Sequence, residues 1–212
     1  MKKKAAKHAG PKTDDFTRIA GYLFEVGLLR QTPRAHAAPL LSGVDLTDNI
    51  ASHSFRAAHV AWWLASFEGA DPCKTAMMCL LHDMPEARSN DHNWISKRYV
   101  KVFDDEIIAD QFGSLPATGT PLHGLILEYQ KRESVEAKIA KDADLIDQIL
   151  LLKEYEHRGN KEAEHWLDSE NESARRWQRE AYFSESAHKL ALAIRDQSPS
   201  KWWHSLWTNK NR

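Results

Sequence analysis

The stretch Met77-Met78-Cys79-Leu80-Leu81-His82-Asp83-Met84-Pro85 carries an imidazole and a carboxylate at the end of an apolar run. Asp71-Pro72, a favourable N-cap followed by a proline at the first helical position, predicts that a helix starts just before this run. The turns that follow are apolar on nearly every side, which is typical of a buried helix. Burying His82 and Asp83 is costly unless each has a partner, and a divalent metal ion with further ligands would serve both.

The next residues predict an opening beside this histidine and aspartate. Pro85 is expected to end or bend the helix, because it cannot donate to the carbonyl of Leu81 and its ring crowds that carbonyl. The polar residues 86–93 are then expected to form a loop at the mouth of the opening.

Two other predicted helices carry side chains that could complete the site. On a helix expected over roughly residues 49–67, His53 shares a face with Ala57 and Leu64 and should point inward. A long helix expected over roughly residues 122–155 carries three aspartates near its apolar stripe. Spacing alone leaves all three open as a ligand: Asp142, Asp144 and Asp147.

The whole chain shows helical periodicity and no useful period-two alternation, so we expect an all-α protein with a single domain. Further helices are expected over roughly residues 15–29, 95–112, 161–168 and 173–195. The expected organisation is a flexible basic arm at 1–12, a helical core at 13–198 and a tryptophan-rich C-terminal segment at 199–212.

Composition limits the possible partners. The 29 basic and 30 acidic residues nearly cancel, which gives no support for binding a nucleic-acid polymer or a membrane surface. No apolar segment follows the basic arm and none approaches the length of a membrane span, so we expect a cytoplasmic protein. Cys73 and Cys79 lie six positions apart on one predicted helix and are interpreted as core thiols.

At this point the chain resembles the HD-domain metal-dependent phosphohydrolases, and most closely the 5′-deoxynucleotidase branch. The likeness covers roughly residues 29–155 and depends on four stretches: Asn49–Ser54, Leu81–Ala87, Glu136–Lys138 and Lys141–Asp144. The resemblance implies a helical bundle, a homodimer and these metal ligands: His53, His82, Asp83 and Asp144. It thereby selects the aspartate that periodicity could not.

The resemblance also implies the chemistry. One divalent transition metal, Mn, Co, Fe, Ni or Zn, would be bound, since imidazole and carboxylate ligands do not choose among them. Metal-bound water would attack the 5′-phosphate of a (deoxy)nucleoside monophosphate, a small-molecule substrate. Glu86 would act as acid or base or orient the water, Asp91 would hold the sugar hydroxyl, and Arg34 would bind the phosphate.

Two positions depart from the family pattern. Ala35 and His36 follow Arg34, where the family has a tryptophan that helps to exclude ribose, so selectivity for deoxyribose is not implied. Ser52 precedes the first ligand, where the family often has glutamate.

Two alternatives remain open. One is an HD hydrolase of another nucleotide, such as a triphosphate or alarmone, or of another phosphate ester. The other is a non-catalytic module that binds metal or nucleotide.

Overall fold

The computed structural model of the protein describes residues 12–35, 48–168, 172–204 and 206. Within these ranges the structure is all-α, as predicted, and the only strand-like pairing is an isolated bridge between Pro33 and Asn49. Most of the predicted basic arm, His36 and the last six residues of the C-terminal segment lie outside the described ranges. The α-helices are α1 (Thr13–Leu28), α2 (Ile50–Glu68), α3 (Pro72–Leu81), α4 (Glu86–Ser89), α5 (Asp104–Gly113), α6 (Thr120–Lys131), α7 (Val135–His157), α8 (Lys161–Leu167), α9 (Glu185–Arg195) and α10 (Lys201–His204).

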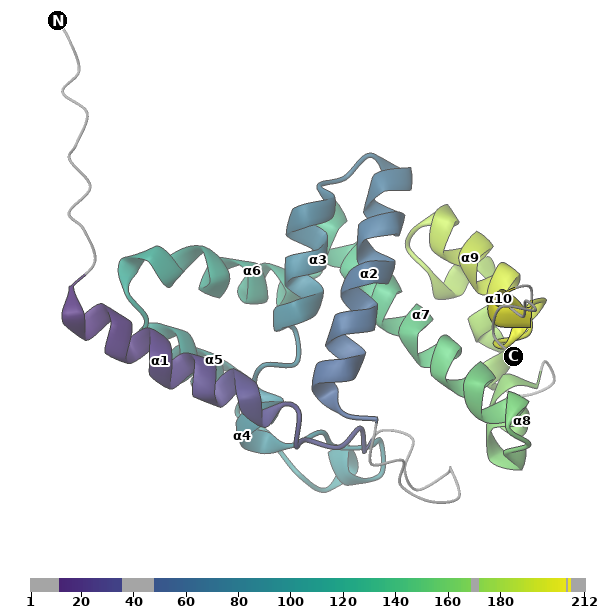
Figure 1. The fold of residues 1–212 in the computed structure, drawn as a ribbon, viewed down its shortest axis with the longest axis horizontal. Coiled ribbons are helices and arrows are strands. Elements are labelled where there is room, and N and C mark those ends of the chain that lie inside the picture. Colours follow the sequence, from purple (N-terminus) through teal and green to yellow (C-terminus); the bar gives the residue numbers. More distant parts are fainter. Residues whose placement is uncertain (1–11, 36–47, 169–171, 205, 207–212) are drawn as a thin grey trace, which may run out of the picture.

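Helices α2, α3 and α7 lie at the centre of the molecule, with α1, α4, α5 and α6 at one end and α8, α9 and α10 at the other (Figure 1). The central core consists mainly of small and aliphatic side chains, among which Leu64, Met78, Ile139 and Ile146 are almost completely buried. Each such side chain contributes about 1.5–3 kcal/mol relative to an exposed position. This core holds the three helices that carry the predicted ligands.

Local signals define the ends of the central helices. The Asn49 side chain accepts a hydrogen bond from the backbone of Ser52 at the start of α2, and Gly69 ends this helix in the left-handed region with φ 71°. The predicted start of α3 is confirmed, because Asp71 accepts from the backbone of Lys74 and Pro72 is the first helical residue. Helix α3 ends at Leu81, so the predicted interruption near Pro85 is also confirmed and His82 is the C-cap.

The single long helix expected over residues 122–155 is wrong, because two helices occupy this segment. Helix α6 ends at Lys131, and its C-cap Arg132 adopts the left-handed conformation with φ 54°. Helix α7 begins after Ser134, whose side chain accepts from the backbone of Ala137. The apolar periodicity continues across this corner although the backbone direction changes.

Two other predicted helices are also shorter than expected. In the segment 95–112 a 3₁₀ turn, Ser96–Arg98, precedes an irregular stretch, and α5 begins only at Asp104. In the segment 173–195 two 3₁₀ turns precede α9, whose N-cap is Ser184. Asp142 on α7 accepts hydrogen bonds from the backbone of Phe183 and from the backbone and hydroxyl of Ser184, and these contacts separate the turns from the helix.

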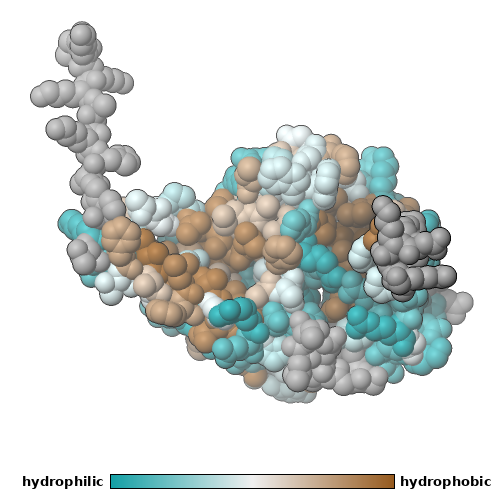
Figure 2. Space-filling model, viewed as in Figure 1, coloured by the Kyte–Doolittle hydropathy of each residue, from teal (hydrophilic) through white to brown (hydrophobic). Residues whose placement is uncertain are grey.

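The surface carries several exposed apolar side chains. Figure 2 shows apolar surface along α1 and towards the central helices.

Cys79 is buried as predicted, whereas the expectation for Cys73 is wrong because this thiol is exposed near the start of α3. Among the described residues, no helix combines the length and apolar character needed to cross a membrane. The exposed aromatic and aliphatic side chains of the first two helices, called the apolar face below, are Phe16, Leu23, Phe24, Leu28, Phe55, Trp62, Trp63 and Phe67.

Candidate metal centre

The four predicted ligands come from two helices and the turn after a third, and they lie together. His53 is on α2, His82 and Asp83 follow the last residue of α3, and Asp144 is on α7. The Nε2 atom of His53 lies 3.3 Å from Nε2 of His82, 3.3 Å from Oδ1 of Asp144 and 3.5 Å from Oδ2 of Asp83. Nε2 of His82 lies 3.1 Å from Oδ2 of Asp83. Ligand atoms of His53, His82 and Asp144 all lie within 4.8 Å of one another, and Asp83 lies beside both histidine nitrogens.

The other ring nitrogen of each histidine, Nδ1, makes a hydrogen bond on the side away from the shared point. Nδ1 of His53 lies 2.6 Å from Oδ2 of Asp147, and Nδ1 of His82 lies 2.7 Å from the backbone carbonyl of Cys79. In both cases Nδ1 can donate its hydrogen, which leaves Nε2 with a lone pair towards the shared point. This is the usual support for histidines that bind metals.

The electrostatics of this cluster also favour a cation. Burial lowers the pKa of His53, but hydrogen bonds to Asp144 and Asp147 outweigh burial and raise the pKa to about 9. Burial acts to raise the pKa of Asp144, but the hydrogen bond to His53 and the charge of Lys141 hold it well below its usual range. These nitrogen and oxygen atoms and their negative charge therefore fit a divalent cation, which would replace the proton of His53.

A cavity of about 320 Å³ opens over the four ligands. Arg34, Glu86 and Asp91 line it, so the structure brings all the sequence-predicted site residues to one place. The Arg34 backbone donates to the carbonyl of Asp48 at 3.1 Å, and its Nη1 atom lies 4.0 Å from Oδ2 of Asp147.

Glu86 is an acid of this cavity whose pKa is raised. Its Oε2 atom is buried and has no hydrogen-bond partner among the described residues. Burial, followed by the charges of Asp83 and Asp91, raises the pKa of Glu86 to about 9. The site therefore favours a protonated Glu86 until a cation is bound, since a dication stabilises the carboxylate form instead.

Several lining residues were not identified from the sequence. The cavity wall also carries three cations, Lys97, Arg132 and Lys141. Outside the wall, Asp147 contacts the Nδ1 atom of His53. The only sequence signal for Asp147 was its place three positions after Asp144, one of the alternatives left open. Lys97 and Arg132 lie in segments predicted to be continuous helices, so their approach to the site depended on breaks that the prediction missed.

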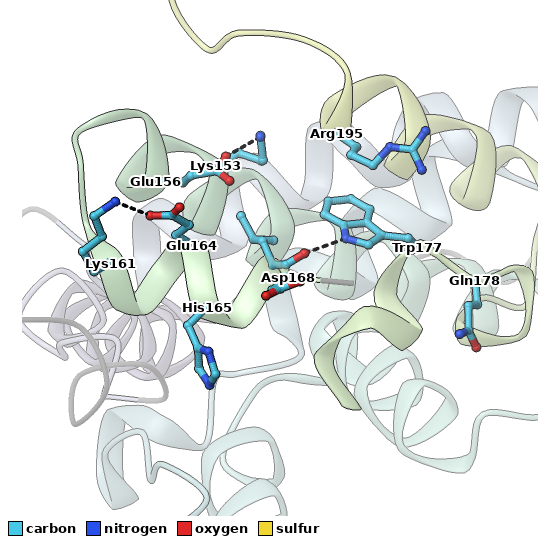
Figure 3. A pocket seen from close by; sticks show the side chains of 10 residues that line it. Lys153, Glu156, Lys161, Glu164, His165, Asp168, Trp177, Gln178 and Arg195 are labelled. Atoms are coloured by element: carbon cyan, nitrogen blue, oxygen red, sulfur yellow. Dashed lines mark hydrogen bonds and ion pairs between the residues drawn. The ribbon is translucent and has the colours of Figure 1, made fainter. Parts of the chain in front are cut away.

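A second, larger hollow of about 890 Å³ lies between α7, α8 and α9 (Figure 3). Its charged side chains pair with one another, as in Lys153 with Glu156 and Lys161 with Glu164, and the indole of Trp177 donates to the carbonyl of Leu167. No predicted ligand lines it. Volume alone therefore does not locate the reactive groups in this protein.

The chain is similar to known proteins over most of its length. A model of the HD domain matches residues 26–185. A 5′-deoxynucleotidase of Schizosaccharomyces pombe is 26% identical over 152 residues, which cover 68% of this chain and 75% of that protein. A solved structure described as a predicted metal-dependent phosphohydrolase of Magnetospirillum magnetotacticum has a TM-score of 0.62 and 22% identity, and the match covers 86% of this chain and 92% of that one. A protein of Pyrococcus horikoshii has a TM-score of 0.61 and 26% identity, with 82% and 98% covered.

Proposed function

The chain belongs to the HD-domain family, and from this premise we propose that it is a metal-dependent phosphohydrolase that removes the 5′-phosphate from (deoxy)nucleoside monophosphates. The observation that carries this proposal is the convergence of His53, His82 and Asp144, with Asp83 beside both histidines, at the base of a cavity that also contains Glu86. The similarity to the Schizosaccharomyces pombe 5′-deoxynucleotidase supports the choice of substrate.

The charge of the cavity suits a phosphate dianion. Its wall contains four acidic side chains and four basic ones, namely Asp83, Glu86, Asp91, Asp144, Arg34, Lys97, Arg132 and Lys141. A bound dication would make the sum positive. It would also supply an activated water and polarise the phosphoryl group, with Mn, Co, Fe, Ni and Zn all compatible with these ligands.

The chain's own residues would bind the substrate and move protons. Arg34 would bind phosphoryl oxygens with its planar fork of donors. Glu86 would hold or transfer a proton at the reacting oxygen, because its unpartnered oxygen lies in the same cavity. Asp91 would accept a hydrogen bond from a sugar hydroxyl.

A panel of substrates tests the proposal. With Mn²⁺ or Co²⁺, we expect phosphate release from nucleoside monophosphates to exceed release from triphosphates and generic phosphate esters. Glu86→Gln should retain the metal but lower kcat, by roughly 100-fold, the scale of general acid or base catalysis. Preferred release from a triphosphate or a simple ester would assign another substrate, and absence of release from every compound would favour a binding module.

We also propose that two copies of the chain associate through the apolar face. Phe24 and Phe67 are 81% and 74% exposed, and Trp62 and Trp63 lie on the same helix as Phe67. Aromatic side chains of this kind are enriched at protein interfaces. The proposed dimer is tested at the scale of the whole molecule below.

A further inference from the structure

Building on the proposed function, we propose that Arg132 makes the site selective for phosphate monoesters over diesters by binding one terminal phosphoryl oxygen. The residue lies in the corner between α6 and α7 and lines the cavity above the four predicted ligands. Its role rests on three observations, namely its backbone conformation, the position of its guanidinium and the contrast with Arg34 and Lys141.

The backbone of Arg132 has a conformation that arginine rarely adopts. Its φ of 54° places it in the left-handed region, which is typical of glycine at the end of a helix. Gly69 and Gly159 have positive φ elsewhere in the chain, at 71° and 84°. A long basic side chain at this kind of position suggests a task for the side chain itself.

The side chain of Arg132 is held against the metal centre. Its Cζ atom lies 3.2 Å from the centre of the Tyr129 ring, and that ring packs edge-on at 5.1 Å against the ring of His82. Stacking on Tyr129 fixes the plane of the guanidinium. The Nη1 atom is buried and has no hydrogen-bond partner among the described residues. The site therefore holds an oriented donor without an acceptor.

Lys141 and Arg34, two of the three other cations of the cavity, have different positions. Nζ of Lys141 lies 2.6 Å from Oδ2 of Asp144, so this ammonium supports a ligand. Arg34 approaches Asp147, which holds His53, whereas Arg132 stacks on Tyr129, which contacts His82. The guanidinium of Arg34 thus lies on the side of His53, and the guanidinium of Arg132 lies on the side of His82.

This arrangement distinguishes the two kinds of ester by their number of free oxygens. A monoester has three unesterified oxygens, so one can face the metal ligands while Arg34 and Arg132 each bind another. A diester has only two, so one of the arginines is left without its oxygen. Since the proposed function already assigns one oxygen to Arg34, Arg132 should contribute to binding of a monoester and little to binding of a diester.

The test uses the full chain loaded with Mn²⁺ and two ligands that it should not hydrolyse. Methylphosphonate, which has three free oxygens, stands for the monoester, and dimethyl phosphate stands for the diester. In Arg132→Gly we expect the Kd for methylphosphonate to rise by roughly 10-fold, the scale of one hydrogen bond to a charged group, with an unchanged Kd for dimethyl phosphate. KM for a nucleoside monophosphate should rise by a similar factor.

The choice of glycine separates this role from folding. Glycine adopts a φ of 54° without strain, so Arg132→Gly should keep the thermal stability and the Mn²⁺ affinity of the parent. Arg132→Lys should recover only part of the binding, because lysine has the charge but lacks the planar fork. Lys131→Gln is the matched control, since it removes a neighbouring exposed cation at the end of α6 and should change neither Kd.

The outcomes separate this inference from the proposed function. If the parent chain releases phosphate from nucleoside monophosphates but Arg132→Gly binds methylphosphonate as tightly, the assignment of Arg132 is wrong. Equal weakening for both ligands would also overturn it, because the proposed contact of Arg132 is made with the monoester only. If the parent releases no phosphate from any ester, the proposed function fails, whereas the two binding measurements still decide the role of Arg132.

Discussion

Asp147 shows how a single residue outside the predicted ligand set shapes the metal centre. One of its oxygens lies 2.6 Å from Nδ1 of His53, and the other lies 2.5 Å from Nε of Arg56. Arg56 in turn donates to Glu154 at 2.7 Å. Burial acts to raise the pKa of Asp147, but the hydrogen bond to His53 and the charges of His53 and Arg56 keep it below its usual value. A negatively charged Asp147 would make the Nε2 atom of His53 a stronger metal ligand.

Asp147→Asn is therefore expected to weaken metal binding. The amide keeps the shape of the carboxylate but loses the charge that supports the imidazole, and changes of this kind cost roughly 10- to 100-fold in metal affinity. Calorimetric titration with Mn²⁺ or Co²⁺ measures the effect. Asp142→Asn, on the same helix, is the control, because Asp142 accepts from Phe183 and Ser184 and does not line the cavity. Equal affinity in parent and Asp147→Asn would remove Asp147 from the site's support.

At the scale of elements, Glu25 ties α1 to the turn that follows α3. Its carboxylate accepts two hydrogen bonds from Arg88 of α4, at 2.5 and 3.0 Å, and one from Gln111 of α5, at 2.8 Å. Gln111 also donates to the carbonyl of Met84, directly after the two ligands of the turn. The hydrogen bond from Arg88 lowers the pKa of Glu25, although burial acts in the opposite direction.

This contact predicts a pH-dependent contribution to stability. Because the pKa of Glu25 is lower in the folded state than its usual 4.5, the contribution is present above pH 4.5 and is lost as the pH falls through the folded pKa. Glu25→Gln should lower the free energy of unfolding near neutral pH by about 1 kcal/mol, a small value since Arg88 is partly exposed. Urea unfolding should show this difference shrinking in acid. Glu162→Gln, which alters an exposed residue of α8, serves as the control, and a difference that is independent of pH would contradict the assignment.

At the scale of the whole molecule, the apolar face predicts association of two copies. Sedimentation velocity should give the mass of a dimer, and Trp63→Glu together with Phe67→Glu should give a monomer, because two charges would enter a buried apolar contact. Metal affinity should stay unchanged in this variant. Trp202→Glu, on α10, is the control for the C-terminal segment. Dissociation by Trp202→Glu alone would place the contact there and refute the proposed interface.

Much of the molecule could be predicted from local patterns. The all-α class, the start of α3 at Asp71-Pro72 and its end before Pro85 follow from helical periodicity, capping and the missing amide hydrogen of proline. The predictions failed where apolar periodicity continued across a corner. Ser134 and Ser184 are both N-caps and were available as local signals, but the apolar pattern before each of them favoured a continuous helix.

The sequence by itself determined which residue types could bind a metal and that they lie on separate helices, because both features depend on neighbours along the chain. The family resemblance had already selected Asp144, which faces the histidines, but only the tertiary structure decided that Asp147 supports one histidine and that Asp142 anchors the start of α9. Their positions along α7 do not distinguish Asp142, Asp144 and Asp147. The rotation of α7 about its axis distinguishes them, and that rotation is set by packing against α2 and α3, which no local pattern along α7 contains.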